Sequence, residues 1–519
     1  MIFSDPAFLF LFLPIVYGAF YLVARRFGAL GALSVMLVAS ILFYAPYGLF
    51  NLGLLVLAVL VNYSIGSLLI EGSLDGRTRK WLFAGGELFN FVLLGFFKYH
   101  LWPSSLTTGR DWEHFANVAI PVGISFYTFH QAAFLADAYA RERSVVAYLG
   151  SLRSVRDRLA GLVRYAAFVM FFPQLIIGPI TYFHEFQSQA GGRDFGIAKR
   201  RNIAPGLALV AIGLFKKVVL ADRLAPGADY VFGAAAAGEH LSPIAAGVGM
   251  LSYYGQLYFD FSGYSDMALG LALLFGLRYP VNFFSPLKAV GIIDFYRRWH
   301  MTLTRVISRF LYTPLSLIGT RFAVRKKLPK GVLRVLGVWI PLLINFEVIG
   351  LWHGAASTFL LFGVIHGIWY VTETEVRATK AFKRWRKQSS DRLRALIGRA
   401  IFLPLMVACF ALFRSESPGA FLHLIRQMFS FSLNIQGRDL LAGAVLVPAL
   451  AVIYLLPNSA ELLRLYRPVI RTYDNVSYGP HWPKLAWRDS WPWALYLLAL
   501  IGAYLWYVGS LPPFLYQGF

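Results

Sequence analysis

Apolar runs long enough to cross a membrane recur along the chain and restrict its possible folds more than any other feature. The first four lie at Pro6–Ala24, Leu30–Tyr47, Leu52–Ile70 and Trp81–Phe97. A transmembrane helix needs about 20 predominantly apolar residues. Because lipid offers no hydrogen bonds to the backbone, such runs form helices. The sequence therefore predicts an all-α polytopic membrane protein.

The composition supports this class. Of 519 residues, 58% are hydrophobic and 14% are charged, whereas soluble domains average about 45–50% apolar and about 25% charged residues. The formal net charge of +23 comes from Lys and Arg in short loops between apolar runs, which the positive-inside rule explains without a polyanion. We therefore predict contact with the lipid bilayer and no nucleic-acid binding. The single cysteine, Cys409, excludes an intramolecular disulfide framework, and no metal site is predicted.

The loop charges also predict a topology. Arg25 and Arg26 follow the first run, Asn51 follows the second, and the third leads into Arg77 and Arg79. This alternation puts the N-terminus outside and the basic turns in the cytoplasm. A basic segment at Arg141–Arg164 is typical of a helix on the cytoplasmic surface.

We predict one membrane-embedded unit over residues 1–519, with four parts. The N-terminal spans occupy 1–140, a core with re-entrant and cytoplasmic amphipathic helices occupies 141–371, a basic cytoplasmic linker occupies 372–399, and the C-terminal spans occupy 400–519. Re-entrant pieces are expected in the core because its apolar runs are short or interrupted by polar residues. Two of these runs are Ile244–Leu257 and Ala268–Leu277.

Ionisable residues within apolar runs are expensive and mark candidate functional sites. The run Asn345–Trp369 carries Glu347, His353 and His366. A neutral imidazole can take a proton from an alcohol and return it, and Gly350 and Gly354 leave room for a substrate beside His353. From this run alone, a core histidine satisfied by its neighbours is the better explanation.

Two further constellations allow a functional and a structural interpretation. In QLYFDFSGYSDMALG, two acids six positions apart, Asp260 and Asp266, do not share a helical face, which argues against a paired-carboxylate site. They either take part in a site or form structural hydrogen bonds. In DFYRRWHMTLTRVISRFLY, arginines surround His300 beside Trp299. They suit a phosphate or anionic headgroup, or anchor the chain at the cytoplasmic face.

Six motifs in order resemble the membrane-bound O-acyltransferase family, and within it the bacterial alginate O-acetyltransferase branch. They are PVGISFYTF (121–129), FFPQLIIGPI (171–180), LYFDFSGYSDMALG (257–270), DFYRRWHMTL (294–303), LWHG (351–354) and HG (366–367). The opening MIFSDPAFLFLFLP and the closing PPFLYQGF also resemble that branch. The resemblance implies a helical bundle around a central funnel or cavity, open toward both membrane faces.

The resemblance also implies an O-acyltransferase, here an O-acetyltransferase, with site residues that can be named. Its catalytic histidines fall on His353 and His300. We expect the remaining site residues to position the substrate or the active-site helices, or to form the donor entrance; they are Asp260, Tyr258, Ser262, Trp352 and Trp299 for positioning, and Arg297 and Arg298 for the entrance. No bound cofactor is expected, and no cofactor-binding residue is assigned.

The implied partners follow the same scheme. The donor is acetyl-CoA or an acyl carrier thioester on the cytoplasmic side. A periplasmic acetyltransferase partner receives the acetyl group and passes it to a polysaccharide acceptor, so the expected location is the bacterial inner membrane. The sequence departs from the alginate branch at several positions, which leaves alginate, cellulose, another exopolysaccharide or peptidoglycan open as the polymer; these positions are Val306, Ser308, Arg309, Ile349, Ala356 and Phe362.

Two alternatives remain open. D-Alanyl transfer to teichoic acid is a related activity within the family. A polysaccharide transporter or export component belongs to a different class and would use the same cavity without chemistry.

Overall fold

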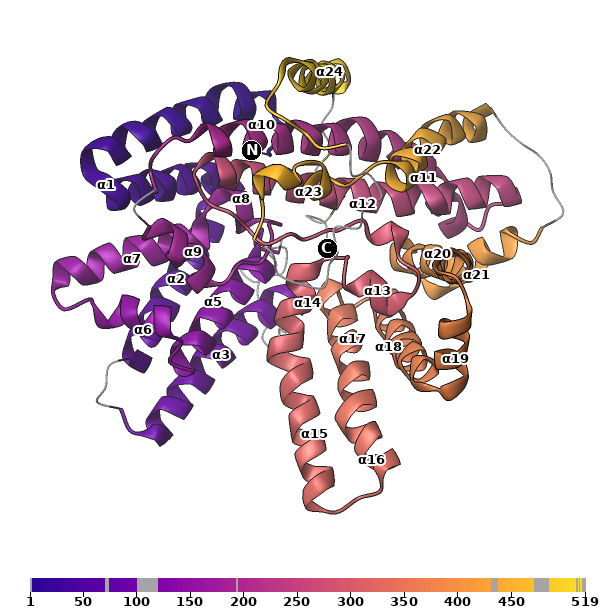
Figure 1. Ribbon diagram of the computed structural model, residues 1–519, viewed down its shortest axis with the longest axis horizontal. Coiled ribbons are helices and arrows are strands. Elements are labelled where there is room, and N and C mark those ends of the chain that lie inside the picture. Colours follow the sequence, from indigo (N-terminus) through magenta and orange to yellow (C-terminus); the bar gives the residue numbers. More distant parts are fainter. Residues whose placement is uncertain are drawn as a thin grey trace, which may run out of the picture.

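Helices form the framework of the chain, as Figure 1 shows. The computed structural model describes residues 2–70, 74–99, 120–192, 195–430, 437–470, 485–509, 512 and 514–515. Within these ranges, six helical segments are long and apolar enough to cross a membrane: Phe8–Tyr47, Leu49–Ile70, Gly76–Tyr99, Arg200–Ala236, Lys330–His353 and Asp391–Arg414. The prediction of an all-α polytopic membrane protein is confirmed. In the closing motif, residues 513 and 516–519 lie outside the described residues.

The N-terminal helices follow the predicted spans closely. The first two predicted spans are the two arms of α1 (Leu13–Tyr44), which is preceded by a π-helical segment at Phe8–Phe12. The arms are separated at Gly28, whose backbone has φ 68° and ψ −160°, a conformation that glycine adopts without a steric penalty. The next helices are α2 (Leu49–Ile70), α3 (Gly76–Tyr99) and α5 (Ile124–Tyr139).

The basic segment at Arg141–Arg164 forms parts of two helices rather than one. These are α6 (Arg143–Gly150) and α7 (Val155–Met170). The break occurs because Ser154 and Asp157 form a capping box that starts α7. Beyond α7 come the short helices α8 (Phe172–Leu175) and α9 (Phe183–Ala190), and the non-helical residues 176–182 between them are buried. Irregular backbone is tolerated at membrane depth when it is buried in protein.

A long buried helix, α12 (Pro243–Leu274), runs through the middle of the molecule (Figure 1). The two apolar runs predicted here as separate pieces are joined in this one helix. All residues from Ser252 to Leu274 are buried, so α12 is covered on every side by its neighbours. The two acids within it, Asp260 and Asp266, find charged partners on a neighbouring element.

Glycine pairs allow α10 (Arg200–Leu214) to lie very close to α12. A methyl group at Gly213 would lie 2.6 Å from the carbonyl oxygen of Gly263, and one at Gly206 would lie 3.0 Å from that of Gly270. Gly206 on α10 lies opposite Gly270, and Gly213, later on α10, lies opposite Gly263, earlier on α12. The two helices are therefore antiparallel. Small residues at such contacts let helix backbones approach in a membrane, where packing replaces the hydrophobic effect.

The remaining helices surround this pair. The helix α10 continues through a π-helical segment, η4 (Phe215–Ala221), into α11 (Asp222–Ala236). The later elements, in chain order, are η5 (Pro286–Lys288), α13 (Ile292–Tyr296), α14 (Met301–Ile307), η6 (Ser308–Tyr312), α15 (Thr313–Arg325), α16 (Lys330–Arg334), η7 (Val335–Trp339), α17 (Ile340–His353), α18 (Ser357–Ala378), α19 (Lys380–Gln388), α20 (Asp391–Arg414), α21 (Pro418–Gln427), α22 (Gly437–Leu455), α23 (Ser459–Leu462), η8 (Arg464–Tyr466) and α24 (Trp491–Tyr507).

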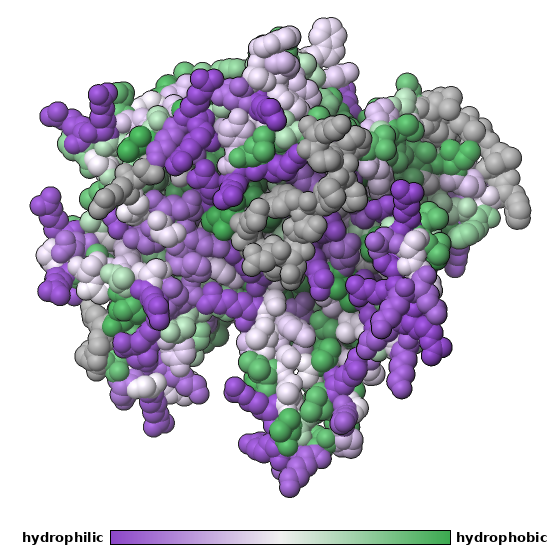
Figure 2. Space-filling model, viewed as in Figure 1, coloured by the Kyte–Doolittle hydropathy of each residue, from purple (hydrophilic) through white to green (hydrophobic). Residues whose placement is uncertain are grey.

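Hydrophilic side chains gather at projecting ends of the molecule. Figure 2 shows them over α19 and at the far end of the hairpin formed by α15 and α16. The sequence of α19 is KAFKRWRKQ, and α15 ends in basic residues followed by Lys326 and Lys327. Both ends therefore carry the positive charge that the topology prediction assigned to the cytoplasmic side.

We expect Gly213→Ala to destabilise the protein by about 1–3 kcal/mol, because the added methyl group overpacks the contact between α10 and α12. Gly233→Ala is the matched control, since a methyl group there meets no atom within 4 Å; it should be neutral or stabilising by about 0.5–1 kcal/mol. Thermal unfolding of both variants in detergent measures the difference. Equal unfolding temperatures would show that the glycines do not set this spacing.

Candidate active site

A cavity lies between α12, α13, α14, α17, α18 and α20. Two histidines from distant parts of the chain, His300 and His353, are part of its wall. The other lining residues are mainly apolar and aromatic: Leu257, Phe295, Tyr296, Trp299, Leu303, Thr304, Ile349, Phe362, Phe410 and Phe413. The structure thus brings both predicted catalytic histidines and Trp299 to one cavity.

His353 is the last residue of α17 and is buried. Its ring lies 4.8 Å from the ring of Phe413 and 6.1 Å from that of Phe359. The chain leaves the helix at Gly354 and begins α18 at Ser357. The predicted helix-length run is therefore broken directly after His353, and the imidazole lies at the end of a helix beside the cavity.

Trp352 connects the two histidines. Its ring centroid lies 4.8 Å from that of His353 and 6.0 Å from that of His300. The buried ammonium of Lys98, from the last turn of α3, lies 5.1 Å from the Trp352 ring centroid. This is a cation–π distance, so a positive charge lies against the ring that contacts both histidines.

His300 lies between α13 and α14 in a left-handed conformation, with φ 43° and ψ 50°. Few residues other than glycine adopt this conformation, because it brings the Cβ atom too close to the backbone. Its Nδ1 is 3.1 Å from the side-chain oxygen of Asn282. Strained backbone of this kind is concentrated at functional sites, which supports a functional role for the buried His300 ring.

The site residues predicted on α12 do not line the cavity, but other residues of the same helix do contact the site. Leu257 lines the cavity and Phe261 contacts the His300 ring at 4.8 Å. Tyr258, Asp260 and Ser262 are buried but are not part of the cavity wall. A role in positioning the active-site helices stays a prediction for these three residues.

The acids of α12 form ion pairs with the adjacent lysines of η4. The ammonium of Lys216 is 2.6 Å from a carboxylate oxygen of Asp266, and that of Lys217 is 2.8 Å from Asp260. Lys217 also contacts Asp222 at 2.7 Å. A π-helical turn is wider than an α-helical one, so neighbouring residues differ less in direction and both lysines reach α12.

Each of these carboxylates also accepts a hydrogen bond from the C-terminal part of the chain. The hydroxyl of Ser459 donates to Asp266 at 2.7 Å, and the backbone N–H of Leu515 donates to Asp260 at 3.1 Å. The interactions therefore tie α12 to the last described residues. This contact pattern supports the structural interpretation of the two acids.

The predicted donor-entrance arginines flank the cavity wall. Arg297 is exposed, and Arg298 is half-buried and forms an ion pair with Asp294 at 2.8 Å. Burial lowers the pKa of the Lys288 ammonium, and the guanidinium groups of Arg399 and Arg298 lower it further, against an opposite effect of Glu461. These cations therefore lie close enough to repel one another, which creates a basic region beside the cavity.

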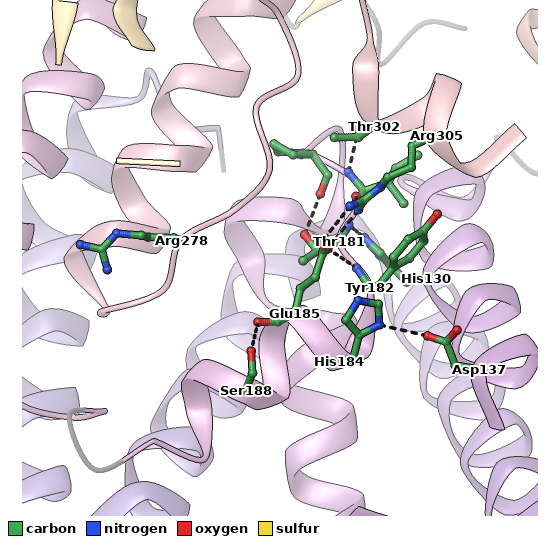
Figure 3. Close-up of polar contacts among 12 residues, drawn as sticks. His130, Asp137, Thr181, Tyr182, His184, Glu185, Ser188, Arg278, Thr302 and Arg305 are labelled. Carbon is green, nitrogen blue, oxygen red and sulfur yellow. Dashed lines mark hydrogen bonds and ion pairs between the residues drawn. The ribbon is translucent and has the colours of Figure 1, made fainter. Parts of the chain in front are cut away.

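The next arginines along the chain are already paired. Figure 3 shows Arg305, which contacts both carboxylate oxygens of Glu185 at 2.5 and 3.0 Å. Its guanidinium lies 4.0 Å from the Tyr182 ring centroid. Arg309 forms an ion pair with Asp137. These arginines anchor α14 and η6 against α5 and α9, in agreement with a structural role.

Asp137 also contacts a histidine at the edge of this cluster. Figure 3 shows the Nδ1 atom of His184 facing Asp137 at 3.3 Å, and this hydrogen bond raises the pKa of His184. The buried His130 accepts a hydrogen bond from the Thr181 N–H at 3.2 Å, as a histidine satisfied between packed elements does.

His366 and the two glycines of Asn345–Trp369 pack closely against neighbouring groups. His366 is fully buried among aromatic rings, and its ring centroid lies 3.9 Å from that of Phe362. A methyl group at Gly350 would lie 2.4 Å from the carbonyl oxygen of Phe359, and one at Gly354 would lie 2.9 Å from its ring. The expectation that these glycines leave room for a substrate is therefore wrong, because α18 occupies that space.

The sequence analysis missed Asn282 and Lys98. Asn282 contacts His300, and Lys98 contacts Trp352. A local signal existed for Lys98, because it is a cation directly after the apolar run Trp81–Phe97. The predicted end of that run, at Phe97, left Lys98 out. Asn282 lies in a loop with no motif of its own, so only the fold identifies it.

The arrangement suits proton transfer in a site with little water. Two imidazoles in an aromatic cavity can accept and return the proton of a substrate hydroxyl, and water exclusion protects a reactive acyl donor from hydrolysis. Among the described residues, no group of three or more His, Cys, Asp or Glu side chains is placed to hold a metal ion.

Comparison with known proteins identifies the chain's relatives. The model of the membrane-bound O-acyltransferase family matches residues 36–417. A peptidoglycan O-acetyltransferase of Helicobacter pylori is 38% identical over 389 residues, which cover 71% of this chain and 69% of that protein. A probable alginate O-acetylase AlgI of Pseudomonas putida is 33% identical over 541 residues, which cover 100% of both chains. A teichoic acid D-alanyltransferase of Bacillus subtilis is 25% identical over 357 residues, 67% of this chain and 81% of that protein.

We expect Asp266→Asn to destabilise the protein more than Asp260→Asn. Removing one partner of a buried ion pair costs about 3–5 kcal/mol when the remaining charge is uncompensated. Lys217 keeps the carboxylate of Asp222 after loss of Asp260, whereas Lys216, among the described residues, keeps the neutral hydroxyl of Ser459 at 3.4 Å. Thermal unfolding in detergent gives the order of the two variants, and the reverse order would contradict a structural role for these pairs.

Proposed function

This chain belongs to the membrane-bound O-acyltransferase family, and we propose that it transfers an acetyl group from a cytoplasmic thioester across the membrane for O-acetylation of a polysaccharide. The polysaccharide is part of the cell envelope or is secreted. The main support is the cavity whose wall holds both His353 and His300. The relatives named as acetylating enzymes of peptidoglycan and alginate support the acetyl group and the polysaccharide.

In the proposed reaction, His353 is the general base. Its imidazole accepts the proton of an acceptor hydroxyl while the hydroxyl oxygen attacks the thioester carbonyl carbon. The carbon–sulfur bond then breaks, and the leaving thiolate takes the proton from the imidazolium. An oxygen ester and a free thiol result, and the neutral histidine is restored.

The apolar lining supports a thioester donor. A thioester hydrolyses when water reaches its carbonyl, and the aromatic residues around the cavity exclude water from the reacting atoms. Because His353 lies at the end of α17 rather than within it, its ring reaches the cavity without an overlying helical turn.

The donor is acetyl-CoA or an acyl carrier thioester. Both carry phosphate on the arm that ends in the thioester sulfur. Arg297 and Arg298 lie between the lining residues Tyr296 and Trp299. With Lys288 and Arg399 they form a basic region that suits phosphate recognition at the donor entrance.

The proposed setting is the bacterial inner membrane, with a periplasmic acetyltransferase partner that passes the acetyl group to the polymer. The candidate membrane-crossing helices and the basic projecting ends support a multi-pass topology with a cytoplasmic donor side. Peptidoglycan, alginate, cellulose or another exopolysaccharide fits as the acceptor.

D-Alanyl transfer to teichoic acid is a second candidate activity. It is favoured by the similarity to the Bacillus subtilis teichoic acid D-alanyltransferase, at 25% identity. The acetylating relatives are more similar, at 33% and 38% identity, so acetyl transfer is the preferred function.

We expect His353→Ala to lower acetyl transfer about a hundredfold or more, because it removes the general base. The measurement is the acetyl content of envelope polymers in a strain that produces the variant at the normal level. His240→Ala, at an exposed position outside the cavity, is the matched control and should leave acetylation unchanged. Normal acetylation in His353→Ala would eliminate the proposed role of His353. Loss of acetylation with intact polymer export would argue against an export component.

We expect Arg297→Gln combined with Arg298→Gln to raise the KM for a phosphorylated acetyl donor about tenfold, which corresponds to one lost charge-assisted contact of about 1.4 kcal/mol. Donor kinetics of the purified protein in detergent measure the effect. Lys326→Gln with Lys327→Gln removes the same charge from an exposed site at the end of α15 and should leave KM unchanged. An unchanged KM in the arginine variant would assign those arginines to anchoring alone.

A further inference from the structure

Asn282 is a fully buried residue that holds the backbone on both sides of His300. Its carbonyl oxygen accepts a hydrogen bond from the Met301 N–H at 2.9 Å, and the Phe284 N–H donates to the Arg298 carbonyl oxygen at 2.9 Å. These bonds fix residues 282–284 beside residues 298–301. They stabilise the left-handed turn at His300, which otherwise costs about 1–2 kcal/mol.

The side-chain amide of Asn282 has a defined orientation. The Thr302 hydroxyl accepts a hydrogen bond from the Ile180 N–H at 3.1 Å, so its own proton is available for the Asn282 atom 2.9 Å away. The backbone N–H of Thr302 also faces this atom, at 3.4 Å. Because both groups donate, the atom is the amide oxygen. The amide nitrogen is then left to donate to the Ser265 hydroxyl at 3.3 Å.

This orientation determines which nitrogen of His300 carries the hydrogen. The amide oxygen lies 3.1 Å from Nδ1, and an oxygen acceptor requires a donor, so Nδ1 is protonated. In a neutral imidazole the lone pair is then on Nε2, at the opposite edge of the ring. The His300 ring contacts the rings of Phe261, Phe283 and Trp352, and these apolar surroundings favour the neutral form.

We propose that Asn282 is a positioning residue that holds His300 in the Nδ1–H tautomer, so that Nε2 accepts a hydrogen bond from the substrate. The proposal rests on the proposed acyl transfer in the cavity shared with His353. A donor group of the substrate other than the attacking hydroxyl donates to His300 Nε2 and so orients the substrate, while the attacking hydroxyl gives its proton to His353. Loss of Asn282 would let the ring adopt the other tautomer, in which Nε2 carries a hydrogen and cannot accept that bond.

The test is the tautomer of His300, measured by nitrogen-15 NMR on the full-length protein with labelled histidine in detergent. The His300 signals are assigned by their loss in His300→Gln. We expect the Nδ1–H tautomer in the unsubstituted protein and a shift toward Nε2–H in Asn282→Leu. Ser265→Ala is the matched control, because it removes only the partner of the amide nitrogen and should keep the Nδ1–H tautomer.

A second variant keeps the test decisive if Asn282→Leu does not fold. Asn282→Asp retains an acceptor for Nδ1–H and should keep a hydrogen on Nδ1. An Nε2–H tautomer in the unsubstituted protein, or an unchanged tautomer in a folded Asn282→Leu, would overturn the proposal. Acetyl transfer should fall about tenfold or more in Asn282→Leu, as is usual when the group orienting a functional histidine is lost. The tautomer is measured without substrate, so normal acetylation in His353→Ala would remove the proposed function without altering this result.

Discussion

The close antiparallel contact between α10 and α12 is the interaction on which the rest of the structure depends. Glycines opposite one another let the two backbones approach, and the lysines that follow α10 then reach the carboxylates of α12. Desolvating four charges is unfavourable unless each is paired and hydrogen-bonded. The short helix separation makes that pairing possible, so packing and electrostatics support each other at this contact.

The residues of α12 have different tasks. The helix is held by the ion pairs with Lys216 and Lys217. Elsewhere on the helix, Leu257 lines the histidine cavity and Phe261 contacts the ring of His300. The loop that follows α12 carries Asn282 to His300, and the C-terminal residues Ser459 and Leu515 contact the acids. Because α12 is fixed in place, it holds the elements that form the site in position relative to one another.

Local patterns in the sequence predicted the features that depend on local physics. Hydropathy predicted the spans because lipid contact acts on each run separately, and the motifs around His353 and His300 predicted residues that share one cavity. The break after His353 was not predicted, because the apolar run continues through it. The lysines 216 and 217 lie in an apolar run with no sign of their partners, and the partner of His300 is a loop asparagine. These contacts are set by the tertiary fold, which a local pattern does not contain.

The contacts between the two ends of the chain bear on biosynthesis. The hydroxyl of Tyr504 donates to the carbonyl oxygen of Ser4 at 3.0 Å. The backbone N–H of Leu515 donates to Asp260, so this bond forms only after residue 515 has been made. Ribosomes release the N-terminal residues into the membrane long before residue 504 is made. The early helices must therefore remain inserted with part of their packing incomplete. Release of a nearly full-length but truncated chain would leave a bundle whose central acid lacks one of its hydrogen-bond donors, a state that membrane quality-control proteases can recognise.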